Sequence, residues 1–150
     1  MALRVRAMRE EDLPRVYEIN RLSFTTDAWS MDAFRREFNL PYSHRFVLEN
    51  EGELIGYAVL WVIKEEAFVM TFAITPEFRN RGAGKWFLKE LLKELKGEVR
   101  SVQLDVRKSN LPAIKLYRSA GFKVVRERPK FYSDGETALV MEVELTPGLV

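Results

Sequence analysis

Apolar residues alternate in some parts of the chain and recur at helical spacing in others, which predicts seven strands and four helices. Residues 67–75 (AFVMTFAIT) are apolar on both faces, as in a central strand. Residues 87–96 place their apolar side chains on one stripe of a helix, and residues 99–107 alternate as in a strand with one buried face. The other strands are expected at 3–8, 45–49, 53–63, 122–128 and 137–145. The other helices are expected at 10–24, at 31–38 with Ser30 as its cap, and within 109–120, with Gly121 just past the end.

The order of these elements, β-α-α-β-β-β-α-β-α-β-β, indicates an α/β (α+β) fold with a mixed central sheet. Turn residues at 50–52 should join two strands into a hairpin, and those at 133–135 should join the last two strands. The strand–helix–strand unit in the middle should be parallel and right-handed. Ligands of open α/β sheets bind beyond the carboxyl ends of strands, so that the segments after residues 75 and 107 are the first places to look for a site.

Composition narrows the class of protein. The chain has 150 residues, 47% of them hydrophobic, and fits one domain over residues 1–150. Its 24 lysines and arginines are interleaved with 22 acidic residues, which makes nucleic-acid binding the least favoured function. The absence of cysteine excludes disulfides and thiolate chemistry, and the single His44 excludes a multi-histidine metal site. Because the first residues are charged and no apolar run could span a membrane, we expect a soluble, cytoplasmic protein.

Residues 79–86 (RNRGAGKW) place two arginines and two glycines between the predicted central strand and the next helix. The segment does not fit the phosphate loop G-x-x-x-x-G-K-[ST], because Arg79 stands at the first glycine and Trp86 at the hydroxyl residue. It does not fit G-x-G-x-x-G either, because Phe87 replaces the third glycine. It does fit [RQ]-x-x-G-x-[GA], with Arg79, Gly82 and Gly84 at the defined positions.

This segment has the properties of a pyrophosphate site. A helix N-terminus offers unpaired backbone N–H groups and the positive end of the helix dipole. Glycine lets a phosphate approach the backbone closely, and Arg79, Arg81 and Lys85 add positive charge. The alternative is a plain turn with solvated arginines.

A second motif lies in residues 109–122 (SNLPAIKLYRSAGF). These residues match N-x-x-A-x-x-L-Y-x-x-x-G-F at Asn110, Ala113, Leu116, Tyr117, Gly121 and Phe122. With the glycine segment upstream, the chain resembles the GNAT family of N-acetyltransferases. More narrowly, LDVRKSN, AIKLYRSAGF and KFYSDGETALVM are similar to the RimI group of ribosomal-protein-alanine N-acetyltransferases and to archaeal protein N-terminal acetyltransferases. The resemblance runs from Ala28–Ser30 to the last strand.

The resemblance implies that acetyl-CoA is the cosubstrate and that it lies between two splayed parallel strands, here 67–75 and 99–107. The pantetheine arm would bond to the first strand and to Asn110, and the pyrophosphate would lie on the glycine segment. The implied cosubstrate-binding residues are Phe72, Ala73, Ile74, Arg79, Asn80, Arg81, Gly82, Ala83, Gly84, Lys85, Asn110 and Tyr117.

The resemblance also implies two catalytic residues. Tyr117 would protonate the departing thiolate, and its alternative is a core aromatic of an amphipathic helix. Asp105 stands where RimI-type enzymes carry a glutamate in an E-V-R sequence, so that its shorter side chain would act on the amine through a water. Because an α-amino group titrates near 8, such a weak base suffices. The alternative for Asp105 is an ion pair with Arg107 on the same strand face.

The candidates to line the acceptor groove are Trp29, Phe24, Phe131 and Tyr132. The resemblance carries over only Tyr132, which keeps the hydroxyl, and Trp29 and Phe24 can equally belong to the core. The leading function is transfer of acetyl to the N-terminal α-amino group of a protein, for example a ribosomal protein, by direct attack on the thioester. One alternative is a GNAT enzyme acting on a small-molecule amine or a lysine side chain. A polyamine site would need clustered acids, and Glu65-Glu66 does not map near the predicted site.

Another alternative is a module that binds CoA without turnover. The presence of Tyr117 argues against such a module, and the aspartate at position 105 argues mildly for it. The sequence leaves the oligomeric state open and is compatible with a monomer.

Overall fold

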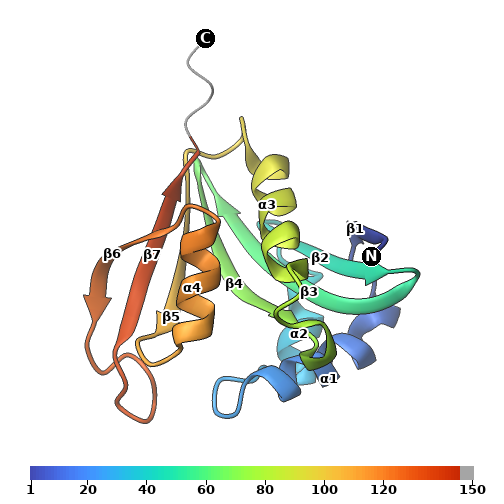
Figure 1. Ribbon diagram of the computed structural model, residues 1–150, viewed down its shortest axis with the longest axis horizontal. Helices are drawn as coiled ribbons and strands as arrows, with labels where there is room; N and C mark the ends of the chain where they lie inside the picture. Colours follow the sequence, from blue (N-terminus) through green and yellow to red (C-terminus); the bar gives the residue numbers. More distant parts are fainter. Residues whose placement is uncertain (146–150) are drawn as a thin grey trace. The chain divides into compact units, whose positions relative to one another are not determined.

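The computed structural model describes residues 1–145, and these contain the predicted strands and helices in the predicted order (Figure 1). The strands are β1 (Leu3–Ala7), β2 (Ser43–Asn50), β3 (Glu53–Ile63), β4 (Glu66–Ile74), β5 (Ser101–Arg107), β6 (Lys123–Arg128) and β7 (Ala138–Glu144). The α-helices are α1 (Leu13–Ser23), α2 (Met31–Glu37), α3 (Ala83–Leu95) and α4 (Leu111–Ser119). The first turn of the helix predicted at 10–24 is a 3-10 helix, Glu10–Asp12, and the 3-10 helix Pro76–Phe78 was not predicted. The strand order β1-β2-β3-β4-β5-β7-β6 confirms the predicted fold class.

The pairing of the strands follows the predicted connections. β2 and β3 form the expected antiparallel hairpin, and Glu51 and Gly52 in its turn have φ values of 51° and 84°. β6 and β7 form the second antiparallel pair. Glu66–Phe68 of β4 pairs in parallel with Ser101–Gln103 of β5, which confirms a parallel strand–helix–strand unit around α3. The sheet is therefore mixed.

The described chain divides into two compact units, which are treated separately below. The first unit comprises Met1–Trp61 and Met70–Phe87, and the second comprises Val62–Val69 and the chain from Leu88 onward. Among residues 1–145, no helix is both long enough and apolar enough to cross a membrane.

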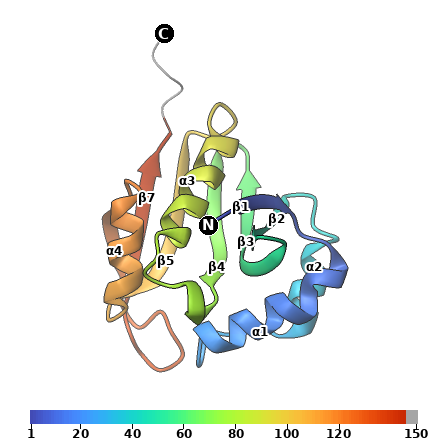
Figure 2. The same cartoon turned by 45° about the vertical axis from the view of Figure 1, so that its right-hand side comes forward.

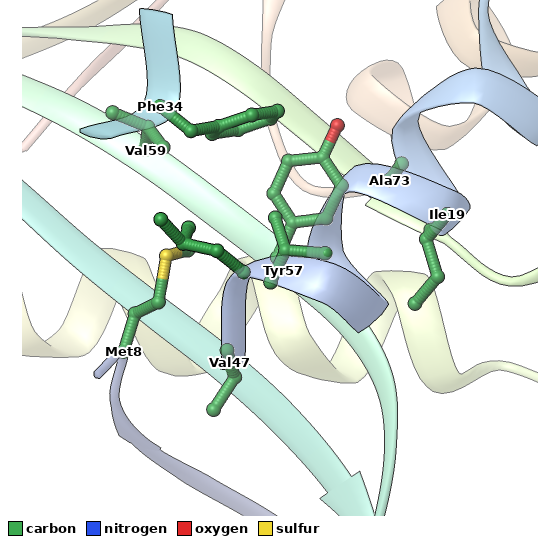
Figure 3. Close-up of a cluster of buried hydrophobic side chains, with 9 residues drawn as sticks. Met8, Ile19, Phe34, Val47, Tyr57, Val59 and Ala73 are labelled. Carbon is green, nitrogen blue, oxygen red and sulfur yellow. The ribbon is translucent and has the colours of Figure 1, made fainter. Parts of the chain in front are cut away.

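The core of the first unit forms where α1 and α2 pack against β2, β3 and β4 (Figures 2 and 3). Phe34 of α2 meets the ring of Tyr57 edge-on, with ring centroids 5.7 Å apart. The Ser30 hydroxyl accepts a hydrogen bond from the Ala33 N–H at 3.1 Å, which confirms the predicted cap of α2. The buried core side chains are Met8, Leu13, Val16, Ile19, Phe34, Val47, Tyr57, Val59 and Ala73.

A buried polar network lies within this core. The Asn20 amide donates to the Tyr57 hydroxyl at 2.6 Å, and that hydroxyl lies 2.9 Å from the Thr71 hydroxyl. The Asn20 carbonyl oxygen accepts the Trp29 N–H at 2.7 Å. Burial raises the pKa of Tyr57 to about 12, so that its hydroxyl stays protonated. The network ties α1 to two strands and to the segment that precedes α2.

The core of the second unit forms around β5, β7 and α4 (Figure 1). Val102, Leu104 and Val106 of β5 are all 5% exposed or less, as their alternation predicts. Helix α4 ends before Gly121, which has a φ of 102° and lies against Val143. The predicted alternation of β5 and the predicted end of α4 before Gly121 are thus confirmed.

Candidate active site

The glycine segment of the first unit leads into α3 through two left-handed residues, Asn80 with φ 62° and Gly82 with φ 84°. The helix begins at Ala83, four residues earlier than predicted, and the Trp86 N–H donates to the Gly82 carbonyl at 3.0 Å. The N–H groups of residues 83–85 therefore have no acceptor within the helix. A Cβ atom at Gly82 would meet no protein atom within 4 Å. The segment is thus an open row of backbone donors at a helix N-terminus, as a phosphate site requires.

Arg79 anchors this segment to the rest of the first unit. Its Nε donates to the Ile74 carbonyl at 3.1 Å, and its Nη2 donates to the Ser23 hydroxyl at 2.9 Å. That hydroxyl in turn donates to the Ile19 carbonyl in α1 at 2.7 Å. The sequence suggested Arg79 as a source of charge for phosphate and gave no sign of Ser23. In the structure its contacts hold the segment between the end of β4 and the end of α1.

The other two cations of the segment are exposed. The guanidinium of Arg81 lies over the ring of Phe78 at 5.2 Å, and Lys85 lies in the first turn of α3. These two side chains therefore provide positive charge at the surface beside the backbone donors.

The carboxyl end of β4 carries the residues that were predicted to meet pantetheine. Phe72, Ala73 and Ile74 are 7% exposed or less, and the Phe72 ring stacks on Phe87 of α3 with centroids 5.4 Å apart. Gly56 of β3 lies so close that an added Cβ would be 3.0 Å from the Ala73 carbonyl oxygen. This strand end is firmly packed in the first unit, and its pantetheine contacts stay a prediction.

In the second unit, Asn110 and Tyr117 lie on α4. The Asn110 Oδ1 accepts the Ala113 N–H at 3.3 Å and caps the helix, and a bond from Asn110 to pantetheine stays a prediction. The half-buried Tyr117 packs its ring against Phe122, with centroids 5.9 Å apart. The ring contact supports the core role considered for Tyr117, and its acid role stays a prediction.

Asp105 forms an ion pair with a partner that the sequence did not suggest. The Nε of Arg128 in β6 lies 3.2 Å from the Asp105 Oδ1, and the two side chains are 41% and 36% exposed. An ion pair of this exposure contributes little to stability. The predicted ion pair of Asp105 with Arg107 is therefore wrong, since Arg128 takes that place and Arg107 pairs with Asp134 and Glu136. The role of Asp105 as a base stays a prediction.

Tyr132 lies in the loop between β6 and β7, called here the Tyr132 loop (residues 129–137). The guanidinium of Arg107 lies 4.1 Å from the centre of its ring. The Arg107 Nη1 also donates to Asp134 at 2.8 Å and to Glu136 at 2.7 Å. Hydrogen bonding to Ser109, and then to Arg107, keeps the pKa of Glu136 below its usual value.

Trp29 and Phe24 pack against the core of the first unit. The ring centroids of Trp29 and Phe34 are 5.1 Å apart. This supports the reading of both residues as core, and an acceptor role for Trp29 stays a prediction. His44 is exposed on β2, and no group of three His, Cys, Asp or Glu residues in the described part of the chain could hold a metal.

A hollow of about 520 Å³ lies in the second unit, away from the predicted chemistry. It is lined by Lys64, Glu65, Glu66, Arg100, Ser101, Glu142 and Glu144. Ser101 is the first residue of β5, whereas Asp105 and Arg107 lie toward the other end of the strand. The acidic pair Glu65-Glu66 therefore lies at the opposite end of β5 from Asp105, the candidate base.

Comparison with known proteins agrees with the motifs. A model of the acetyltransferase (GNAT) family matches residues 13–122. A Bacillus subtilis protein named as a putative [ribosomal protein bS18]-alanine N-acetyltransferase is 40% identical over 146 residues, covering 94% of this chain and 95% of that protein. The N-alpha-acetyltransferase RimI of Mycobacterium tuberculosis is 35% identical over 131 residues, covering 84% and 82%. The crystal structure of the ribosomal-protein-S18-alanine N-acetyltransferase from Escherichia coli matches with a TM-score of 0.86 at 29% identity, covering 95% and 94%.

Proposed function

Because this chain belongs to the acetyltransferase (GNAT) family, we propose that it transfers the acetyl group of acetyl-CoA to the N-terminal α-amino group of a protein. N-acetyltransferase activity follows from the family. The choice of an α-amino group as acceptor is supported by relatives that are named for this reaction and match most of the chain. The name of the Bacillus subtilis relative supports a ribosomal protein as acceptor, and we propose that the protein works in the cytoplasm. The family match includes parts of both compact units, which supports one catalytic domain.

The observation that carries the proposal is the open row of backbone N–H groups after left-handed Gly82. Diphosphate fits this place, because the donors have no acceptor within the helix and no side chain fills the space above the glycine. In this proposal, Arg81 and Lys85 neutralise the negative charge of the diphosphate. Arg79 keeps the segment in its conformation through its bonds to Ile74 and Ser23. Asn110 and the end of β4 are assigned to the pantetheine arm.

The proposed reaction uses two catalytic side chains, an acid and a base. The neutral amine forms the new C–N bond at the thioester carbonyl, the C–S bond breaks, and the thiolate leaves. Tyr117 is assigned to protonate that thiolate, whose conjugate acid is about one to two pKa units more acidic than a phenol. Asp105, acting through a water, is assigned to accept the proton that the amine loses. An α-amine suits such a base, because it titrates near 8 whereas lysine titrates near 10.4.

A small polyamine is the second candidate acceptor, and the structure gives it less support. The acids Glu65, Glu66, Glu142 and Glu144 line a hollow at the start of β5, whereas Asp105 and Arg107 lie toward the end of that strand. A cationic substrate bound among those acids would be drawn away from the candidate catalytic residues of the second unit. A peptide N-terminus does not depend on such a cluster.

The test is a thiol-release assay with matched acceptors. The proposal predicts turnover with short peptides that carry a free N-terminus and lack lysine, and much slower turnover with the same peptides blocked at the N-terminus. Preference for spermidine would transfer the proposal to small amines. Binding of acetyl-CoA without release of thiol in any mixture would establish a non-catalytic CoA-binding module.

The base can be tested separately. Asp105→Asn should shift the pH profile of turnover to higher pH, because more of the amine must then be neutral without help. Arg128→Gln removes the ion-pair partner and keeps the carboxylate, so that it serves as the matched control. An unchanged profile in Asp105→Asn would leave the residue a structural role only.

A further inference from the structure

Backbone hydrogen bonds hold the stem of the Tyr132 loop to the end of β5. At its stem, Arg107 pairs with Ala138 in the β5–β7 register, and the Lys108 N–H donates to the Thr137 carbonyl at 3.0 Å. Within the loop, the Gly135 N–H donates to the Tyr132 carbonyl at 2.8 Å. The backbone around Tyr132 is therefore closed into a compact turn.

The side chains of Arg107 and Glu136 hold this turn to the end of β5. The Arg107 Nη1 donates to both Asp134 and Glu136, and the Arg107 side chain is only 16% exposed. The second carboxylate oxygen of Glu136 accepts the Ser109 N–H at 2.8 Å. Glu136 thus bridges the end of β5 to the residue before Asn110, and both of its oxygens are used.

The same guanidinium also supports the Tyr132 ring. Its Cζ lies 4.1 Å from the ring centre, in the range where a cation and an aromatic face attract each other. One arginine therefore fixes the loop backbone through two carboxylates and the orientation of the ring through its face. A ring fixed in this way loses little further freedom when it binds a ligand.

We propose that Arg107 and Glu136 are positioning residues for the acceptor: they hold the Tyr132 loop so that the Tyr132 ring contacts the first residues of the acceptor peptide. This inference rests on the proposed function, since it assumes a peptide acceptor. It adds two residues that neither the sequence motifs nor the comparisons assign to acceptor binding.

The experiment compares three variants of the full chain in steady-state kinetics. Glu136→Ala removes both bonds and should raise the KM for the peptide roughly tenfold, the loss expected when charge-assisted hydrogen bonds that order a binding loop are removed. The KM for acetyl-CoA should stay within about twofold, because the loop does not hold that ligand. Glu136→Gln keeps an acceptor for Ser109 and should fall between wild type and Glu136→Ala. Glu127→Gln breaks the neighbouring exposed ion pair with Lys108 and is the matched control, with no expected effect.

A double-mutant cycle decides whether Glu136 acts through Tyr132. In a Tyr132→Ala background, the further change Glu136→Ala should have little additional effect on the peptide KM. Full additivity of the two effects would overturn the inference, as would equal changes in the KM values of peptide and acetyl-CoA.

Trypsin cleavage after exposed Lys130 gives a readout besides activity, and it should be faster in Glu136→Ala than in the control. Unchanged cleavage would contradict the fastening role even if no peptide were acetylated, whereas an inactive wild type would contradict the proposed function alone.

Discussion

Gly82 and Gly52 form a matched pair for testing the phosphate site, because both have a φ of 84° and neither has a protein atom within 4 Å of an added Cβ. Gly82 precedes α3, whereas Gly52 lies in the turn between β2 and β3. Alanine at either position therefore brings the same backbone strain and no clash within the protein. Only at Gly82 would the methyl group project into the proposed place of the diphosphate.

The cost of backbone strain is the same in both variants, whereas a loss of acetyl-CoA affinity is expected only at Gly82. A left-handed alanine costs about 1–2 kcal/mol, and the lower entropy of the unfolded chain offsets about 0.4–1 kcal/mol of this. The net loss of about 1 kcal/mol should lower Tm by about 2–4 °C in both variants. At Gly82 we expect the Kd for acetyl-CoA to rise at least about tenfold, which corresponds to about 1.4 kcal/mol.

The assay is calorimetric titration of acetyl-CoA into wild type, Gly82→Ala and Gly52→Ala, with thermal unfolding of each in the absence of ligand. The expected result is two similar shifts in Tm and one change in affinity. Equal affinities in the two variants would refute the assignment of the backbone cradle. A loss of affinity in Gly52→Ala would show that strain, rather than the position of the methyl group, controls binding.

Three further predictions concern chemistry, packing and pH. Tyr117→Phe should lower kcat about a hundredfold and leave the Kd for acetyl-CoA nearly unchanged, whereas an unaltered kcat in a thiol-release assay would remove its acid role. Gly56→Ala should lower the free energy of unfolding in urea by about 1–3 kcal/mol, since the new Cβ would lie 3.0 Å from the Ala73 carbonyl oxygen; wild-type stability would contradict that packing. Arg6 lowers the pKa of Asp12, so their pairing should stabilise the fold above the ordinary carboxyl pKa of about 4 and fade as pH falls through the lower folded value. Asp12→Asn should flatten this acid limb of stability against pH, and an unchanged limb would contradict the prediction.

Local patterns were sufficient to predict the fold. The alternation of Val102, Leu104 and Val106 predicted the buried face of β5, and the serine at position 30 predicted the cap of α2. The start of α3 was placed four residues too late, because Gly84 has a low helix propensity and looked like part of a loop. The first turn of a helix tolerates such a residue, and here that turn supplies the donors of the proposed site.

Partners distant in sequence could not be predicted in the same way. Arg79 bonds to Ser23, 56 positions away, and Asp105 bonds to Arg128, 23 positions away. Neither pairing can be recognised from a local sequence pattern, because each depends on the tertiary fold that brings the two residues together. Glu136 shows the same limit, since its bridge from Arg107 to Ser109 appears only when β5 and β7 are paired. Motifs therefore located candidate residues, and the structure gave their contacts.

The acceptor is the central claim, and tandem mass spectrometry on one peptide tests it most directly. The peptide should carry both a free N-terminus and an internal lysine, and it should be incubated with the protein and acetyl-CoA until about half is modified. We predict a single acetyl group on the N-terminal α-amine, and none with Gly82→Glu, in which a carboxylate would fill the cradle. Acetyl groups found on the lysine alone, or on neither amine, would contradict the account.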